Sequence, residues 1–252
     1  MASTFSFQGK VYLGNRNSTT GKLEKPVWMG NANPLTLTLN TESEDMIEAF
    51  SGNRLPYDRF VGQKTAEISG TFHEWLPSAL ALALHSQQLS VASGTASDEP
   101  MPTGLVAGDK VKLDHNLISS LVITDSAGAP VTVPDDSTKY VIESARGGII
   151  SWLDVASYTQ PFKAAYSYAE RRAYALFSSP SPERYLLLDG VNTQNNKAVM
   201  ARIYRVRWNP ISDLGLIHEG FGNLPLTGSA LYDEINAADS NMGGFGRFDE
   251  EV

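Results

Sequence analysis

The chain has 252 residues and no cysteine, so disulfide bonds, thiolate metal sites and cysteine nucleophiles are excluded. Its 20 Lys and Arg against 28 Asp and Glu residues give a net charge of −8, which argues against a groove that grips nucleic-acid phosphates. The longest apolar run, Ala79–Leu84, is far shorter than the ~20 residues of a membrane span, and no signal peptide is recognisable at the N-terminus. We therefore expect an acidic protein made in the cytoplasm, without membrane insertion.

The N-terminal part of the chain alternates apolar and polar residues with a period of two, which is typical of half-buried strands. A β-rich run at Phe5–Leu13 is followed by clear alternation at Leu35–Leu39 and at Thr65–Phe72. The connection between the last two, Thr41–Lys64, is far longer than an ordinary loop. It carries aromatic and branched residues that solvent-facing linkers seldom contain, so we predict an extended arm that packs on a neighbouring molecule.

One helix is predicted from Pro77 to about Gln88. Proline suits the first helical turn, and the Ala and Leu residues that follow propagate a helix well. Its apolar stripe requires a sheet face to cover. Shorter helices are predicted at Arg171–Phe177 and at Ser229–Ala237.

The second half of the chain is again mainly β, with turn signals such as Pro134-Asp135-Asp136 between the runs. A small and polar stretch, Ser90–Gly108, is predicted as a flexible connection into an inserted β-rich region at residues 90–157. The acidic C-terminus, Gly243–Val252, is predicted as a flexible tail. The β-rich runs are Leu117–Thr124, Tyr140–Glu143, Gly148–Leu153, Phe162–Tyr168 and Ala198–Trp208.

Catalytic and metal-binding patterns are not found in the sequence. The histidines do not pair at metal-ligand spacing, and no nucleophile elbow, P-loop or dinucleotide fingerprint occurs. No pair among the many carboxylates is singled out for glycoside hydrolysis. We predict a protein that is not an enzyme and that has no cofactor and no metal. The four histidines are His73, His85, His115 and His218.

Two clusters of opposite charge suggest contacts between subunits. Arginines are dense in the Ala198–Trp208 strand, and acidic residues are dense at the start of the predicted arm. Such surfaces on neighbouring subunits could fix their register, although a solvated strand face is the better explanation of the arginines when they are taken alone. The predicted interface residues are Glu42, Glu44, Asp45, Glu48, Arg54, Leu55, Tyr57, Arg59, Arg202 and Arg205.

The order of segments resembles that of the tail tube proteins (major tail proteins) of long, non-contractile-tailed bacteriophages. The resemblance spans about residues 5–231 and depends on element order and loop placement. The stretches that carry it are Phe7–Gly14 with Trp28–Asn31, Ser51–Arg54 leading to the Leu76–Leu84 helix, Asp189–Asn192 with Trp208–Pro210 and Asp213-Leu214, and Phe221–Leu226.

This resemblance implies a single domain over residues 1–252, built as a β-sandwich or partly rolled barrel with one flanking helix. It implies hexameric rings that stack into a tube, with the long loop at Thr41–Lys64 reaching the adjacent subunit or ring. The implied partners are further copies of the chain, a tape-measure protein, and the tail terminator and distal tail proteins. DNA would pass through the tube without specific binding, and the protein would reside in the tail of the virion. The negative net charge agrees with a channel that repels phosphates.

Other functions remain open at this point. A carbohydrate- or receptor-binding β-sandwich module of a virion would expose Trp or Tyr in a groove. A glycoside hydrolase on an all-β scaffold would require a catalytic carboxylate that the sequence does not nominate. The tube proteins of contractile tails and the ring proteins of secretion systems are closer rivals, but they are usually shorter chains.

Overall fold

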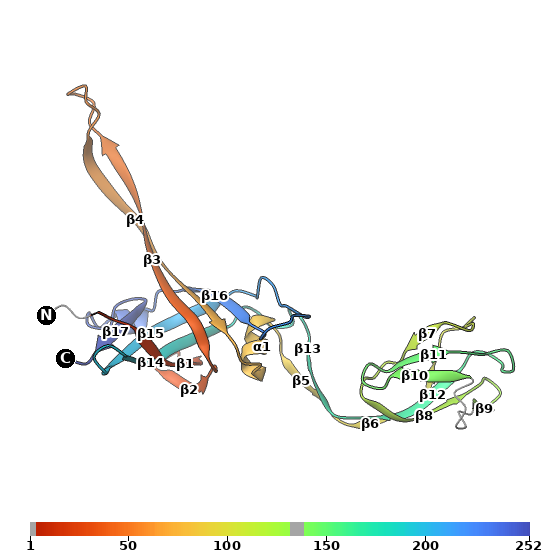
Figure 1. Cartoon of the computed structure of the whole chain (residues 1–252). Coiled ribbons are helices and arrows are strands. Elements are labelled where there is room, and N and C mark those ends of the chain that lie inside the picture. The colour runs from red at the N-terminus through yellow and green to blue at the C-terminus, as the bar shows by residue number, and fades with distance from the viewer. Residues whose placement is uncertain (1–3, 132–138) are drawn as a thin grey trace. The chain divides into compact units, whose positions relative to one another are not determined.

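The computed structural model describes residues 4–131 and 139–252 (Figure 1). Within them the chain forms 17 strands and two short helices, and the pairings within the three larger sheets are all antiparallel. The predicted mainly β class is confirmed. The chain divides into two compact units, one containing residues up to Gln88 and from Tyr174 onward, the other spanning Leu89–Ala173.

The first unit is built on one eight-stranded sheet. Seven strands follow one another across it in the order β2-β1-β14-β15-β16-β4-β3, and β17 pairs with β15 beside this path. The sheet does not close into a barrel, because β2 and β3 remain its two edges. The strands are β1 (Phe7–Arg16), β2 (Leu23–Trp28), β3 (Ala32–Ile47), β4 (Pro56–Phe72), β14 (Glu183–Asn192), β15 (Lys197–Trp208), β16 (Leu224–Ala230) and β17 (Gly246–Glu250).

Helix α1 (Pro77–Ala83) supplies part of the core of the first unit, and Pro77 begins it as predicted. Its side chains at Ala79, Leu80 and Ala83 are buried in the same cluster as Phe72 of β4 and Trp208 of β15. The flanking helix is therefore confirmed, but it is shorter than predicted. It ends before Gln88 because His85 has a left-handed backbone, with φ at 46°.

The predicted loop at residues 41–64 is wrong in its secondary structure. Strands β3 and β4 remain paired far beyond the sheet, from Thr41 opposite Lys64 to Ile47 opposite Pro56. We call this two-stranded ribbon and its tip, residues 41–64, the arm; in Figure 1 it projects from the sheet of the first unit. Period two is weak there because both faces of the ribbon are exposed, so nothing selects apolar residues for one face.

The second unit is a small sandwich with its own core. Trp152 of one sheet stacks on Phe162, which directly precedes a strand of the other sheet, with ring centroids 4.2 Å apart. Strand β12 (Lys163–Tyr168) pairs with both β6 and β8 in the larger sheet. The remaining strands are β6 (Gly94–Pro100), β8 (Ile118–Thr124) and β9 (Pro130–Val131) in the larger sheet, β7 (Lys110–Lys112), β10 (Tyr140–Ser144) and β11 (Ile149–Trp152) in the smaller, and β5 (Gln88–Val91) with β13 (Arg171–Tyr174) as a separate pair.

Several sequence-based boundaries need correction. The β-rich insertion extends beyond residue 157, because β12 completes its larger sheet. Residues 171–174 form β13 rather than a helix, and the predicted flexible connection at residues 90–108 contains β6. The C-terminal tail contains β17, which pairs with β15. The short helix predicted near residue 235 is confirmed as α2 (Glu234–Ala237), while the turn predicted at Pro134-Asp135-Asp136 lies outside the described residues.

Candidate functional site

The arm presents a set of apolar side chains to solvent. At about 3.3 Å per residue, its strand from Thr41 to Ile47 extends roughly 20 Å. Phe50 at the tip is 81% exposed and Phe60 on the returning strand is 71% exposed. Large apolar side chains gathered this densely on one exposed segment make it a candidate interaction site. The exposed large apolar residues of the arm are Met46, Ile47, Phe50, Leu55, Tyr57, Phe60 and Val61.

The tip of the arm is ordered by Glu48. Its carboxylate accepts hydrogen bonds from the backbone N–H groups of Phe50 and Ser51 and from the Ser51 hydroxyl. The hydroxyl contact contributes most to lowering the pKa of Glu48 to about 2. Beside it, the rings of Phe50 and Tyr57 meet edge to face with centroids 6.0 Å apart. Glu48 and Tyr57 therefore shape the tip, within the predicted interface.

Asp45 and Arg59 face each other across the two strands of the arm. The Arg59 Nε lies 2.5 Å from an Asp45 carboxylate oxygen and the Nη2 lies 2.9 Å from the other. This contact lowers the pKa of Asp45. Exposed pairs contribute little to stability, so this pair adds little to the stability of the arm.

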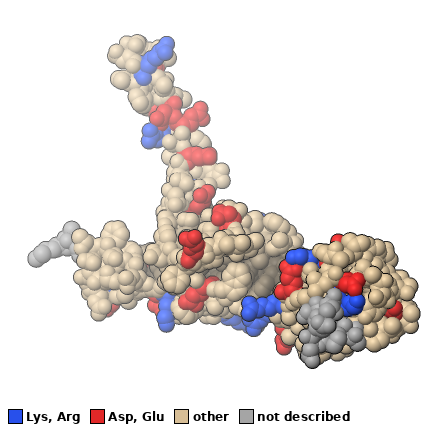
Figure 2. Space-filling model, turned by 45° about the vertical axis from the view of Figure 1, so that its right-hand side comes forward, with Lys and Arg blue, Asp and Glu red and all other residues tan. Residues whose placement is uncertain are grey.

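Four other predicted interface residues of the arm point to solvent. The three charged ones among them form no ion pair with any described residue. Glu42 and Glu44 lie on the outgoing strand, and Arg54 and Leu55 lie at the tip. Figure 2 shows the acidic side chains along the arm and the basic ones nearer to its tip. The sequence thus located a charged and apolar arm, but it missed Met46, Ile47 and Val61, because no period of two marks apolar residues on a ribbon with both faces exposed.

The arginines of β15 have carboxylate partners within the chain. Arg202 contacts Asp249 of β17 at 2.9 Å, while Arg205 and Arg207 contact Glu183 of β14 at 3.1 and 2.5 Å. Burial would raise the pKa of Glu183, but hydrogen bonds from Arg207 and Arg205 outweigh it and lower that pKa. The interface role of Arg202 and Arg205 stays a prediction. Within the chain, both charges are already paired with carboxylates on neighbouring strands of the sheet.

A second exposed apolar segment lies in the connection from β15 to β16. Leu216, Ile217 and Phe221 are almost fully exposed there, between glycines. None of these three residues is among the interface residues predicted from the sequence, although three large apolar residues in a glycine-rich connection are a usable signal. It adds to the surface of the first unit that a partner could cover.

The described residues hold no cluster suited to metal binding. In residues 4–131 and 139–252, no three His, Cys, Asp or Glu side chains gather where they could hold a metal ion. The buried His85 contacts the Trp208 carbonyl oxygen at 3.2 Å, and the exposed His73 contacts the Asn33 carbonyl oxygen at 3.1 Å. Among the described helices, none has the length and apolar character needed to cross a membrane.

Comparison with known proteins gives a family without an assigned activity. Residues 4–249 match the family described as "Protein of unknown function UCP028589", and the chain belongs to this family. A search of curated proteins gives no match.

Proposed function

We propose that the chain is a structural subunit of a bacteriophage tail tube, which self-assembles into stacked, hexameric rings through which phage DNA passes. The observation that carries the proposal is the arm, a two-stranded ribbon with large apolar side chains exposed on both faces. A two-stranded hairpin alone has marginal stability in water. Contact with a neighbouring subunit would cover its apolar side chains and stabilise it.

The energy available from the arm is comparable with the cost of association. Burying one large apolar side chain contributes about 1.5–3 kcal/mol, so half-burial of the arm's seven exposed large apolar residues contributes about 5–10 kcal/mol. Association costs an estimated 4–15 kcal/mol of lost freedom. One arm contact would therefore be weak alone, whereas a closed ring shares the cost among several contacts. Repeated head-to-tail contacts close into rings or extend into filaments.

The remaining parts of the proposal come from the resemblance to tail tube proteins. The partners would be further copies of the chain, a tape-measure protein, and the tail terminator and distal tail proteins, and the location would be the virion tail. The role is structural, without enzymatic activity. The net charge of −8 would disfavour adhesion of DNA to the tube wall.

The experiment is negative-stain electron microscopy of the purified chain over a range of concentrations, with light scattering on the same samples. We expect rings or striated tubes. A matched variant replaces residues 44–60 with a short turn, and we expect it to stay folded, because none of the residues in the core of the first unit lies in that segment. Tubes of normal length from this variant would refute the role of the arm.

One observation favours the alternative of a carbohydrate-binding module. Trp75 is 72% exposed and lines a hollow of about 250 Å³ together with His73 and His218. Sugars stack on exposed indole rings, so quenching of tryptophan fluorescence by glycans, abolished in Trp75→Ala, would support this function. The arm would then have no explanation.

A further inference from the structure

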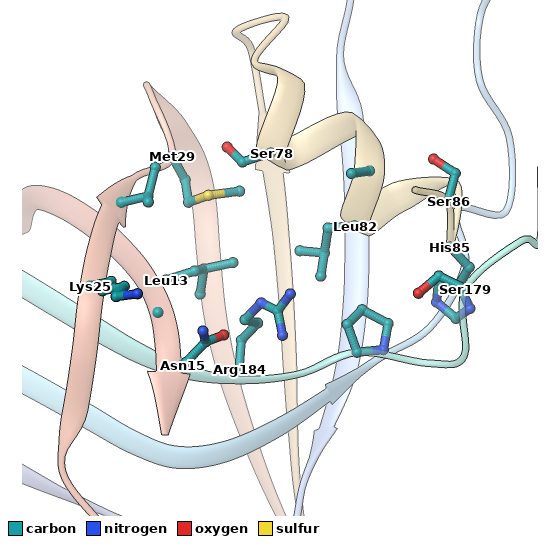
Figure 3. Close-up of a pocket in the computed structure, with 14 residues that line it drawn as sticks. Leu13, Asn15, Lys25, Met29, Ser78, Leu82, His85, Ser86, Ser179 and Arg184 are labelled. Atoms are coloured by element: carbon teal, nitrogen blue, oxygen red, sulfur yellow. The ribbon is translucent and has the colours of Figure 1, made fainter. Parts of the chain in front are cut away.

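A cavity of about 330 Å³ lies in the first unit between α1, the β1–β2 hairpin and the start of β14. Its walls are mostly apolar on one side, where Leu13, Met29 and Leu82 face it (Figure 3). The Arg184 side chain enters the cavity between Leu13 and Leu82 (Figure 3). The volume is within the range of ligand sites, which combine apolar walls with a few polar groups.

Arg184 has no carboxylate partner in the described part of the chain. Its Nη1 donates a hydrogen bond to the backbone oxygen of Glu183 at 2.8 Å, and no ion pair is formed within 4.0 Å. Burial lowers its pKa. By contrast, the neighbouring Arg205 and Arg207 contact Glu183, and Arg16 contacts Asp233 at 2.6 Å. A half-buried guanidinium without a counter-charge is unfavourable.

Two further groups in the cavity lining point to an acidic ligand. The Ser86 hydroxyl is buried and has no hydrogen-bond partner, although buried hydroxyls are normally paired. Lys25 of the edge strand β2 contributes a second cationic side chain. The combination of Arg184, Lys25 and a hydroxyl beside apolar walls suits a carboxylate carried on an aliphatic stem.

We propose that this cavity binds a glutamate side chain from the arm of a second copy of the chain. The cavity borders β2 and the arm continues β3, and these strands are the two opposite edges of the same sheet. Glu42 and Glu44 of the arm are exposed and form no ion pair among the described residues. A head-to-tail contact joins different surfaces of two identical subunits, so the acids of one copy can meet the cations of the next. The inference rests on the self-association in the proposed function. It identifies the cavity as the place on one subunit that receives the arm of the next.

The first test measures binding of a fluorescent peptide with the sequence of residues 40–48 to the full chain by anisotropy. We expect Arg184→Met to weaken binding at least tenfold, while Arg172→Met, at an exposed arginine, leaves it unchanged. A peptide with Glu42→Gln and Glu44→Gln should bind the wild-type chain as weakly as the unmodified peptide binds Arg184→Met. For this altered peptide, Arg184→Met should cause no further loss of affinity. Because Arg184→Met removes an uncompensated charge, its thermal midpoint should equal or exceed that of wild type.

Three outcomes of the binding experiment would overturn the inference: no binding of the peptide by wild type, equal binding by Arg184→Met, or succinate competing as well as the peptide on a molar basis. The last would identify a site for free carboxylates. Electron microscopy of the same variants separates this inference from the proposed function. Normal tubes from Arg184→Met overturn the cavity contact alone, whereas Arg184-dependent peptide binding by a chain that never forms tubes supports the cavity and counts against a tail tube.

Discussion

Replacing Phe60 with serine should impair assembly without affecting the fold. The side chain is 71% exposed on the arm, so its loss changes the stability of the monomer by no more than about 0.5 kcal/mol. If a neighbouring subunit covers it, the loss removes about 2 kcal/mol per contact. Because about 1.4 kcal/mol corresponds to a tenfold change in equilibrium constant, each contact weakens by roughly 30-fold.

The assay is sedimentation of the assembled protein over a series of concentrations, which gives the critical concentration for assembly. We expect this concentration to rise by roughly 30-fold in Phe60→Ser, while circular dichroism gives an unchanged thermal midpoint. Phe177→Ser is the matched control, because this phenylalanine is 73% exposed but lies outside the arm. An unchanged critical concentration in Phe60→Ser, or an equal rise in the control, would refute the argument that the arm's apolar surface drives assembly.

Three further predictions concern stability. Asp233 is fully buried and accepts two hydrogen bonds from Arg16, so Asp233→Ala should cost about 3–5 kcal/mol in urea unfolding, and a loss below 1 kcal/mol would contradict this. The carboxylate of Glu48 has its pKa lowered to about 2, so its contribution to the tip of the arm is complete above the ordinary value of 4.5 and is lost as the pH falls toward 2. The protection of the Ser51 amide against exchange, relative to its intrinsic rate at each pH, should fall over that range in wild type and be low at all pH values in Glu48→Gln. Trp152 is fully buried, so Trp152→Ala should destabilise the second unit by about 3–5 kcal/mol, and unchanged proteolysis of that unit would show otherwise.

The strands that the sequence predicted correctly have one buried face. At residues 66–72 the side chains of Ala66, Ile68 and Phe72 enter the core while those between them are more exposed. Because burial alternates along the strand, apolar and polar residues alternate in the sequence with a period of two. Strand β14 lacks this pattern, because Leu186, Leu187 and Leu188 are consecutive and a continuous apolar run fits a strand or a helix. The sequence therefore misses it.

The sequence predicts where the candidate site lies along the chain, but it does not predict the contacts within the site. Aromatic residues in a long connection correctly indicate an unusual arm, but the pairing of Asp45 with Arg59 depends on a hairpin register that no period reveals. The partners of the β15 arginines, Glu183 and Asp249, lie in strands that the sequence analysis missed. The charge clusters in the sequence therefore suggested contacts between subunits, whereas in the structure the β15 arginines contact carboxylates of the same chain.

This pairing changes how the β15 arginines should be tested. Reversing Arg205 to glutamate would place a carboxylate beside Glu183 and disturb the β14–β15 pairing, so a loss of assembly could reflect damage to the sheet. Arg205→Gln avoids the repulsion and leaves Glu183 in contact with Arg207. Because the pair is partly exposed, we expect the free energy of unfolding to change by less than about 1 kcal/mol. If Arg205 serves only its own sheet, the critical concentration for assembly stays unchanged, and a rise at constant stability would place Arg205 in a contact between subunits.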